Sequence, residues 1–391
     1  MKLVVVGFGQ CGCNIADEFY AINRYAKSLF GRRIEIVTDA FAVNTDEADL
    51  GGFKNILKDR NHRILIGSIR TLGHGVGKIN TEAAKIIRES HSIASDTILR
   101  SKKFHESDAI MVIASGGGGT GSGTIGWSIK ELKERVDKPV YAIVVLPFRY
   151  EERGEASFAV LNSATCIKTV ERYADAVFLA DNERFRKTGN SLAQNFKEMN
   201  QEIVGSFFDL CCAGEERNQK YLGSKVIDAG DIKQSLEGMS TIGRGQTDLS
   251  TFYRWLKADF RTGVQERSAS AGALQQAENS LGIKVQLEDA RKILALITGP
   301  RDALAMPMLE EVSTYLQEKS PKSVVRIGDY PRRGKEFSVT VIASKLTKVP
   351  RLESLYLQAE DIFQRRQEID RESERTIERM RATAGNLPLL G

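Results

Sequence analysis

Eight consecutive residues, 116–123, carry the strongest chemical signal in the chain. They read Gly-Gly-Gly-Gly-Thr-Gly-Ser-Gly and directly follow an apolar run over residues 108–115 that has the length of one buried strand. Glycines let backbone N–H groups turn toward an anion at close range, and Thr120 and Ser122 add hydroxyl donors. A helix pattern that begins near Thr124 directs its positive amino end at the same place. This segment is therefore predicted to bind phosphate.

The glycine-rich segment differs from a P-loop, because it lacks the lysine of G-x-x-x-x-G-K-[ST] that reaches the terminal phosphates. The positive charge must therefore come from elsewhere, and we expect a metal ion. A flexible linker is the alternative interpretation of the glycines. Linkers do not normally lie between a buried strand and an amphipathic helix, so the pattern favours a binding loop.

A second glycine pattern follows the first apolar run, residues 2–6. Residues 7–12 have the G-x-G-x-x-G spacing, and a helix pattern follows over residues 14–27. Taken alone, this spacing indicates a dinucleotide-binding loop, and an NAD-dependent dehydrogenase is the corresponding alternative function. No acidic residue ends a strand about 20 positions further on, because Asp39 comes late, and the glycine-rich segment would be left without a role. Both observations disfavour the dehydrogenase.

Apolar runs alternate with helix patterns through the first half of the chain. Besides residues 2–6, strands are predicted at 33–37, 42–43, 61–66, 109–114, 140–146 and 176–179. This alternation predicts an α/β fold with a doubly wound, mostly parallel sheet. Ligands bind such sheets at the carboxyl ends of the strands. The loops expected there are rich in polar residues and glycine, at 44–46, 71–78, 147–153 and 181–183.

The second half of the chain predicts a smaller α+β domain behind a long connecting helix. The helix pattern runs from about residue 191 to 212, and a polar stretch follows to 224. Strands are predicted at 291–298, 323–327 and 336–343, with a helix at about 303–317. We expect a binding domain at 1–190, a connecting helix and loop at 191–223, the α+β domain at 224–348 and a charged helical tail at 349–391.

The tail is dense in Arg, Glu and Gln from Arg351 onward and has a loose apolar stripe of Leu355, Ile362, Ile369 and Ile377. This pattern predicts an exposed or lightly docked helix. Residues 387–390, Leu-Pro-Leu-Leu, are either a partner-docking peptide or an unstructured terminus.

Composition excludes several classes of protein. A net charge of +5 from 56 basic and 51 acidic residues gives no argument for a nucleic-acid partner. No apolar stretch approaches the roughly 20 residues needed to cross a bilayer, and the chain enters a strand directly after Lys2 without a signal peptide's cleavage region. We therefore expect a cytoplasmic protein. Five cysteines without C-x-x-C spacing and four scattered histidines favour buried thiols over disulfides or zinc.

Together these motifs resemble the tubulin/FtsZ superfamily. Residues 117–123 read GGGTGSG, a string specific to that superfamily. Residues 9–12 and 181–183, Gly-Gln-Cys-Gly and Asp-Asn-Glu, are similar to loops of tubulin, whereas residues 43–46, 73–77 and 147–151 are similar to loops of FtsZ. The resemblance extends from residue 2 to about 346. This mixture, in a chain of FtsZ-like length, most resembles CetZ, the archaeal tubulin-like family.

The resemblance implies GTP or GDP as ligand, together with Mg²⁺. The residues implied to hold the α and β phosphates are Gly9, Gln10, Cys11, Gly12, Gly117, Gly118, Gly119, Thr120, Gly121 and Ser122. Gly75 and Gly77 are implied to meet the γ-phosphate. Asp46 is implied to hold the metal, directly or through water, as a hard oxygen ligand, and Asn44 of the same loop belongs to the nucleotide-binding set.

The resemblance also implies residues that hold the nucleoside. Asn182 is implied to read the guanine edge and Asn200, on the connecting helix, to be the second reader, with Gln201 as an alternative one residue on. Glu151 is implied to accept from the ribose hydroxyls with Arg153 nearby, although Glu152 stands where the family has glycine. Ordinary structural roles are the alternative for these residues, as turn formers, helix starts or solvated helix positions.

The phosphate loops contain no general base, and the superfamily supplies carboxylates from the next subunit. Residues 226–231, Val-Ile-Asp-Ala-Gly-Asp, match that catalytic loop, and Asp228 and Asp231 are the candidates. Such carboxylates would orient a water molecule against the γ-phosphate. Val226 replaces the family's asparagine, which affects the expected rate. A helix N-cap at Asp231 is the structural alternative, and the two roles are compatible.

The resemblance thus implies a cytoskeletal GTPase that assembles head-to-tail into protofilaments and hydrolyses GTP at subunit interfaces. A role in cell shape is expected. The alternatives are an FtsZ-type division GTPase and a GTP-binding scaffold that polymerises with little hydrolysis. No transmembrane segment is expected, and a tether through the tail has no support in its composition.

Overall fold

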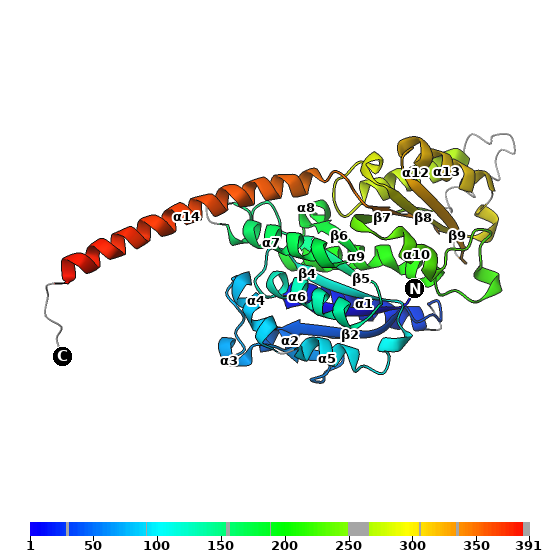
Figure 1. The fold of residues 1–391 in the computed structure, drawn as a ribbon. Coiled ribbons are helices and arrows are strands. Elements are labelled where there is room, and N and C mark those ends of the chain that lie inside the picture. Colours follow the sequence, from blue (N-terminus) through cyan, green and yellow to red (C-terminus); the bar gives the residue numbers. More distant parts are fainter. Residues whose placement is uncertain are drawn as a thin grey trace.

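The computed structural model describes residues 1–28, 31–90, 92–153, 157–187, 189–248, 266–304, 306–333 and 336–385. Within these residues one sheet of ten strands crosses the molecule in the order β3-β2-β1-β4-β5-β6-β7-β10-β8-β9 (Figure 1). Residues 387–390, which the sequence offers as a docking peptide, lie outside the described residues.

The first six strands form the predicted doubly wound half of the sheet. They are β1 (Leu3–Phe8), β2 (Val37–Asn44), β3 (Arg63–Leu65), β4 (Ala109–Ser115), β5 (Val140–Leu146) and β6 (Ala176–Asp181), and they all pair in parallel. Both faces of β1, β4, β5 and β6 are buried, which is why these four strands read as continuous apolar runs instead of alternating ones. The predicted α/β fold class is confirmed.

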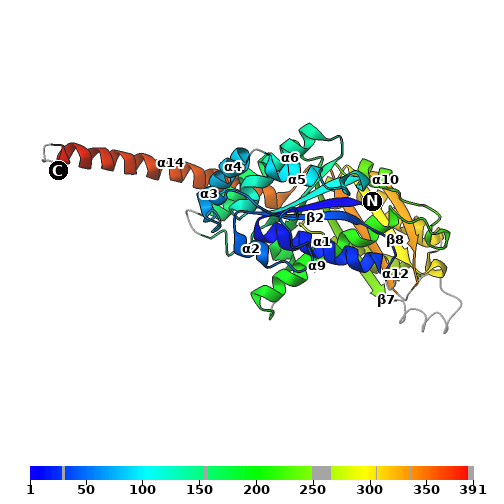
Figure 2. The same cartoon turned by 90° about the horizontal axis from the view of Figure 1, so that it is seen from below.

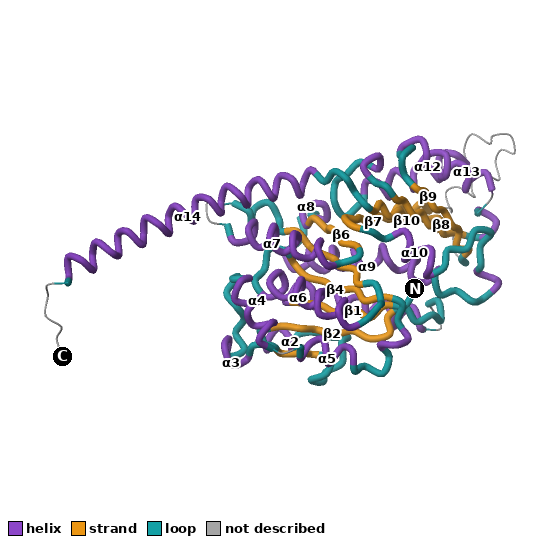
Figure 3. Tube along the Cα trace, viewed as in Figure 1, coloured by secondary structure: helices purple, strands orange, loops and turns teal. Residues whose placement is uncertain are grey.

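Helices cover both faces of this half of the sheet, as Figure 3 shows. They are α1 (Gly9–Lys27), α2 (Glu47–Gly51), α3 (Ser68–Thr71), α4 (Asn80–Glu89), α5 (Ile93–Leu99), α6 (Thr120–Arg135), α7 (Phe158–Tyr173), α8 (Asn182–Phe185) and α9 (Leu192–Ala213). Alternate residues of β1 divide between two cores: Leu3 and Val5 pack with α1 and α9, whereas Val4 and Val6 pack with α4, α6 and α7. The strand order reverses direction between β1 and β4, the point at which such sheets bind ligands.

The second half of the sheet continues from β6 through β7 (Gly238–Asp248), which pairs in parallel with β6. The remaining strands are β8 (Lys292–Gly299), β9 (Val324–Pro331) and β10 (Glu336–Ser344), and the helices here are α10 (Ala229–Ser235), α12 (Glu266–Asn279) and α13 (Met306–Lys319). Helices α12 and α13 pack their apolar residues on the β8 and β10 side chains in a third core.

The predicted strands at 33–37 and 42–43 are wrong in their bounds, because one strand spans Val37–Asn44. Asn23 of α1 explains the late start, since its Oδ1 accepts the N–H groups of Ile36 and Val37 at 2.9 and 3.0 Å. The polar residues that hid the strand have partners in the interior: Thr38 Oγ1 donates to the carbonyl of Leu3, and Asp39 accepts from Ser101.

The last helix, α14 (Pro350–Ala384), is one 35-residue helix that leaves the body of the molecule. Arg351, Leu352, Leu355, Ala359 and Ile362 are buried, and α14 contacts α7 there. Further along, Ile369 and Ile377 are 59% and 47% exposed. Figures 1 and 2 both show α14 extending past the end of the molecule that carries α3 and α4. The predicted tail helix is therefore docked at its start and exposed beyond.

Candidate functional site

The two glycine loops touch at the carboxyl end of β1 and β4. Gly9 has φ +67°, and a Cβ there would lie 2.8 Å from the backbone nitrogen of Gly121. A Cβ on Gly121 would lie 2.6 Å from the carbonyl oxygen of Phe8. Side chains are excluded from both positions, so the structure brings Gly9, Gln10, Cys11 and Gly12 directly alongside residues 117–122.

Two helices begin at this contact without a side-chain cap. Helix α1 starts at Gly9 after Phe8, and α6 starts at Thr120 after Gly119, and neither flanking residue makes a side-chain cap hydrogen bond within the part of the chain that the structure describes. The first N–H groups of a helix lack intrahelical partners, and the helix dipole adds positive potential there. Two such ends directed at one place form a site for an anion.

The loop between α3 and α4 closes this site from a third side. A Cβ on Gly119 would lie 2.7 Å from Val76 Cγ2 and 2.9 Å from the Cα of Lys78. Asn162 Nδ2 donates to the carbonyls of Lys78 at 2.8 Å and Gly118 at 3.0 Å, which pins the two loops together. Gly75 and Gly77 both have positive φ, +77° and +58°. The structure thus places these two glycines beside the glycine-rich segment.

The loop after β2 reaches the same site through Thr45, whose Oγ1 lies 2.7 Å from Thr120 Oγ1. Asp46 caps α2, because its Oδ1 accepts the N–H of Asp49 at 3.0 Å. Its other oxygen, Oδ2, lies 3.7 Å from the position of a Cβ on Gly75. One carboxylate oxygen of Asp46 therefore faces the loop that carries Gly75.

Asp49 is a residue of this site that sequence reasoning missed. Its Oδ1 accepts from Gln10 Nε2 at 2.9 Å and its Oδ2 accepts from Asn44 Nδ2 at 3.0 Å. Burial raises the pKa of the Asp49 carboxyl, the two hydrogen bonds lower it, and the nearby charge of Asp46 raises it further. Asp49 thereby fixes the amides of two predicted site residues. Asp49 lies outside the motif at residues 43–46, and no other signal in the sequence points to it.

The fit of a metal ion can be judged from the acidic groups. Among the described residues, no group of three or more His, Cys, Asp or Glu side chains is arranged to hold a metal ion. Mg²⁺ commonly binds through one or two carboxylates together with substrate phosphates and water. Asp46, placed beside the anion site and with one oxygen directed at the Gly75 loop, fits that pattern as a single protein ligand.

The loop after β5 lies next to the first glycine loop and folds around Glu151. Glu151 Oε2 accepts the N–H of Phe148 at 2.9 Å. Burial raises the pKa of the Cys11 thiol to about 12, and the nearby Glu151 carboxylate acts in the same direction. Arg153 is exposed, and its side chain contacts no partner within the described residues.

Asn182, at the start of α8, carries a buried acceptor without a partner. The residue is 6% exposed, and its Oδ1 makes no hydrogen bond to any group that the structure describes. An unpaired buried acceptor costs roughly 1–3 kcal/mol. The amide of Asn182 therefore fits a ligand that donates N–H groups.

Asn200 and Gln201 occupy different positions around α9. Asn200 is half-buried on α9, one helical turn after Phe196, whose ring lies 5.7 Å from the ring of Phe148 in the β5 loop. Gln201 is exposed and hydrogen-bonds Glu18 of α1. Asn200 is thus the residue on the face of α9 that carries contacts with the β5 loop.

Asp228 and Asp231 form the N-terminal cap of α10. The N–H of Asp231 donates to Asp228 Oδ1 at 2.8 Å, and the N–H of Asp228 donates to Asp231 Oδ2 at 3.3 Å, a reciprocal capping box. The N-cap is Asp228, so the expected cap at Asp231 is corrected by three residues. Each carboxylate keeps one oxygen that the box does not use.

This acidic pair lies at the opposite edge of the sheet from the anion site. Near the acids, a Cβ on Gly214 would lie 2.6 Å from the nitrogen of Met1 and 3.5 Å from the nitrogen of Ala229. Met1 precedes β1, whereas the glycine contact follows it, and six strand residues span about 20 Å. In Figure 1 the chain start and α10 lie on the right, and α3 and α4 lie on the left. The acids and the anion site of one molecule therefore cannot meet.

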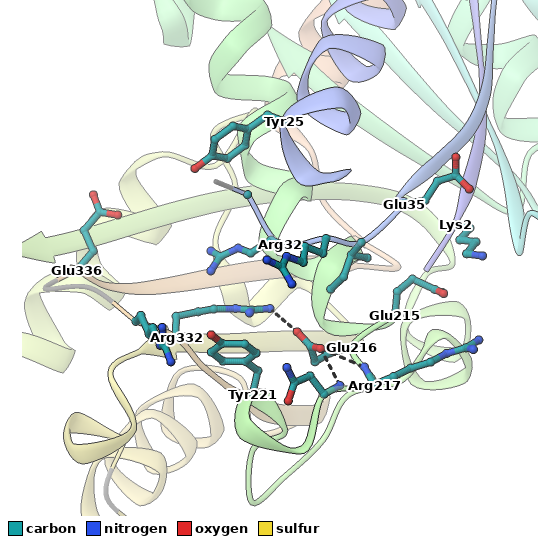
Figure 4. A pocket seen from close by; sticks show the side chains of 15 residues that line it. Lys2, Tyr25, Arg32, Glu35, Glu215, Glu216, Arg217, Tyr221, Arg332 and Glu336 are labelled. Atoms are coloured by element: carbon teal, nitrogen blue, oxygen red, sulfur yellow. Dashed lines mark hydrogen bonds and ion pairs between the residues drawn. The ribbon is translucent and has the colours of Figure 1, made fainter. Parts of the chain in front are cut away.

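An open cleft of about 890 Å³ also lies at the amino edge, between the end of α1, the loop after α9 and the end of β9 (Figure 4). Two of its arginines are paired: Arg332 lies 2.9 Å from Glu216, and Arg32 lies 2.9 Å from Asp209. It contains none of the residues predicted for the site. The pair of Arg332, at the end of β9, and Glu216, in the loop after α9, joins the two halves of the molecule.

Two protein-family models match this chain. The model of the tubulin/FtsZ family GTPase domain matches residues 2–207, and the model of the tubulin-like CetZ C-terminal domain matches residues 189–361. Between them, the two models cover the anion site and the Asp228 loop.

Individual relatives match over nearly the whole chain. The tubulin-like protein CetZ1 of Haloferax volcanii is 33% identical over 371 residues, 91% of each chain. A solved structure of a GDP-bound CetZ1 monomer from the same organism has a TM-score of 0.78 at 32% identity and covers 92% of this chain and 99% of its own. A GTPγS-bound protofilament of H. volcanii CetZ2 has a TM-score of 0.80 at 26% identity, covering 94% of this chain and 100% of its own.

Proposed function

Because this chain belongs to the tubulin/FtsZ family of GTPases and to its tubulin-like CetZ branch, we propose that it binds GTP and assembles head-to-tail into protofilaments. It then hydrolyses GTP at the interfaces between subunits. The observation that carries this proposal is the meeting of two uncapped helix starts at the Gly9–Gly121 contact, on the edge of the sheet opposite the Asp228 loop.

The phosphates bind where the two glycine loops touch. Backbone N–H groups of residues 9–12 and 117–122 donate to the α and β phosphates, because glycine there leaves the backbone uncovered. Gly75 and Gly77 meet the γ-phosphate from the third side. This arrangement stabilises phosphate charge without the lysine of a P-loop.

The nucleoside binds between the β5 loop and α9. Asn182 accepts N–H groups of guanine through the Oδ1 that has no partner in the described structure, and Asn200 reads the base from α9. Glu151, whose Oε2 is held by the Phe148 N–H, accepts from the ribose through its other oxygen. Arg153 stays at the rim.

Asp46 would hold Mg²⁺ at the phosphate site, directly or through water. When bound, the ion neutralises phosphate charge as a Lewis acid. Gln10 and Asn44 are oriented for the same region by Asp49. The Asp46 side chain needs no rearrangement for this role, since the cap that it gives α2 uses Oδ1.

Hydrolysis requires a second copy of the chain. The free oxygens of Asp228 and Asp231 orient a water molecule against the γ-phosphate of the neighbouring subunit. An interface between one edge of a subunit and the opposite edge of the next subunit is heterologous, and its repetition gives a filament. GTP hydrolysis therefore depends on assembly, and GDP weakens the contact.

The closeness to CetZ proteins supports a role in cell shape within the cytoplasm, and an FtsZ-like division role is the alternative. A scaffold with little hydrolysis is favoured by one observation: Val226, which stands at the family's asparagine position, is 50% exposed and supplies no polar group beside the acids.

The experiment is phosphate release from GTP across a protein concentration series, with light scattering read on the same samples. Specific activity that rises with concentration and scattering supports a site completed between subunits. Hydrolysis independent of concentration contradicts it, and GTP-dependent scattering without hydrolysis identifies the scaffold.

A further inference from the structure

Arg351, the second residue of α14, is a buried cation that joins two loops of the candidate site. Its Nε donates to Asp181 Oδ2 at 3.1 Å, and its Nη1 donates to Glu152 Oε2 at 3.2 Å, with a second, closer ion pair between Nη2 and Glu152 Oε1. The side chains of Arg351, Glu152 and Asp181 are 4%, 5% and 9% exposed. All three charges are thus removed from water together.

Both carboxylates belong to segments that carry predicted nucleoside contacts. Glu152 directly follows Glu151 in the β5 loop. Asp181 directly precedes Asn182, and its Oδ1 accepts the N–H of Glu183 at 3.2 Å, which sets the start of α8. Glu183 Oε2 in turn accepts the N–H of Arg149 at 3.1 Å, so the two loops are also tied to each other.

The packing of α14 on α7 fixes the position of the Arg351 guanidinium. Leu352 and Leu355 of the same helix are 7% and 0% exposed, in the core that α14 shares with α7. About three turns further along α14, the Arg366 guanidinium lies 4.1 Å from the centre of the Phe158 ring of α7. A buried pair that loses one member is strongly destabilised, because the other charge remains buried. The position of α14 therefore determines where the loops that carry Glu152 and Asp181 lie.

We propose that Arg351 is a positioning residue for nucleotide binding. Through Arg351, the first turn of α14 holds the loop proposed to bind ribose (residues 147–153) and the loop proposed to bind guanine (residues 181–183) in a fixed relative position. This inference rests on the proposed function, and it assigns Glu152, Asp181 and Arg351 a role as a unit. Arg351 itself does not touch the nucleotide. Its planar fork reaches two carboxylates from different loops at once, which a single ammonium group cannot reproduce.

The test compares Arg351→Ala with a matched control, Arg332→Ala. The control removes an equally buried pair, Arg332 with Glu216 at 6% and 5% exposure, from the amino-edge cleft of Figure 4. Affinity for fluorescent GDP is measured at protein concentrations below assembly, together with the melting temperature. Competition by inosine diphosphate, which lacks the 2-amino group of guanine, reports how well the base is held.

Both variants should melt at lower temperature, but Arg351→Ala alone should bind GDP more weakly. At metal sites, losing the partner that orients a ligand costs about 10- to 100-fold in affinity, and we expect a loss of ~10-fold here with reduced preference for GDP over inosine diphosphate. Arg351→Lys should recover the melting temperature in part and the preference little. In a cycle with Glu152→Gln, the two losses should be less than additive.

Equal GDP affinity in wild type, Arg351→Ala and Arg332→Ala would overturn the inference. Arg351 would then only attach α14 to the rest of the molecule. Equal losses in both variants would overturn it as well, because a general loosening of the fold would then explain them. Failure of the wild-type chain to bind guanine nucleotide is a separate result, which contradicts the proposed function itself.

Discussion

At the residue scale, the contact between Gly9 and Gly121 decides whether an anion site exists. Gly121→Ala places a methyl group 2.6 Å from the Phe8 carbonyl oxygen. Overpacking of this kind costs about 1–3 kcal/mol, and it separates the two helix starts. We expect a lower melting temperature and loss of GDP binding, measured by fluorescent-nucleotide titration.

Gly205→Ala is the matched control, because a Cβ on Gly205 of α9 meets nothing within 4 Å. Alanine in a helix interior is favoured over glycine by roughly 0.5–1 kcal/mol. The control should therefore melt at the same or a higher temperature with unchanged GDP affinity. Gly121→Ala with wild-type affinity would refute the placement of the phosphates.

The carboxylates of Asp228 and Asp231 can be separated from their capping role. Asn is about as good an N-cap as Asp, and an amide oxygen at position 231 can still accept the Asp228 N–H. Asp228→Asn and Asp231→Asn should therefore keep the fold while removing the charge. General acid–base groups contribute about 10²–10⁴-fold to a rate, and we expect GTP hydrolysis to fall by ~100-fold with GTP binding unchanged. Steady-state phosphate release and light scattering measure both effects.

Long-lived polymers in the Asp231→Asn variant are the accompanying expectation, since GTP would persist at the interfaces. Asp231→Ala should give the same polymers with a somewhat lower melting temperature, because the capping box is lost as well. Loss of nucleotide binding in either Asp231 variant would contradict a role in the neighbouring subunit.

At the element scale, His62 joins the segment before β3 to β2 by charge. A hydrogen bond to Asp39 raises the pKa of His62 to about 9, partial burial opposes the shift, and Asp59 supports it. The Nε2 of His62 lies 3.2 Å from Asp39 and its Nδ1 lies 2.8 Å from Asp59. A pKa above the unfolded value near 6.5 means that this stabilisation is complete below pH 6.5 and is lost as the pH rises to 9.

The melting temperature of wild type relative to His62→Gln should therefore be higher at pH 6 and equal by about pH 9.5. Thermal denaturation at half-unit pH steps measures the difference. A difference that is constant from pH 6 to 9.5 would show that His62 contributes through packing on Phe41, whose ring is 5.4 Å away, and not through its charge.

The sequence was sufficient to predict helices and strands whose apolar pattern is regular. It was insufficient where contacts between residues far apart in the chain determine the structure. The strand at 109–114 and the helix at about 191–212 were predicted within two residues of their ends. Strand β7 was missed because it contains glycines, which are unusual in a strand. These glycines let α12 pack closely on the strand, since a Cβ on Gly245 would lie 1.9 Å from the Ala273 carbonyl oxygen. Motif spacing placed the glycines of the site, but nothing local indicated that Arg351 would join Glu152 and Asp181.

At the scale of the whole molecule, α14 has two parts with different roles. All of its buried residues lie between Arg351 and Ile362. Deleting residues 367–391 should leave the melting temperature and GDP affinity unchanged. Deleting residues 350–391 should lower the melting temperature, because each buried leucine or isoleucine contributes about 1.5–3 kcal/mol. It should also lower the GDP affinity, because it removes Arg351. A large loss of stability in the shorter deletion would contradict this division.

The places of the two functional sites are also a property of the whole molecule. Within the described residues, no helix is long and apolar enough to cross a membrane. The anion site and the acidic pair occupy opposite edges of one sheet, and we propose that an active site arises where one copy meets the next. Because each subunit contributes one half of two different sites, two inactive variants should restore each other when they are mixed.

The most direct measurement is therefore GTP hydrolysis by a mixture of Asp228→Asn and Gly118→Glu. A Cβ on Gly118 meets nothing within 4 Å, so Gly118→Glu should fold normally while its carboxylate repels the phosphates. Each variant alone should be nearly inactive. We predict that the mixture hydrolyses GTP well above the sum of the two, because intact acids of one variant meet bound GTP on the other. Activity no greater than that sum at any mixing ratio would contradict a site shared between subunits.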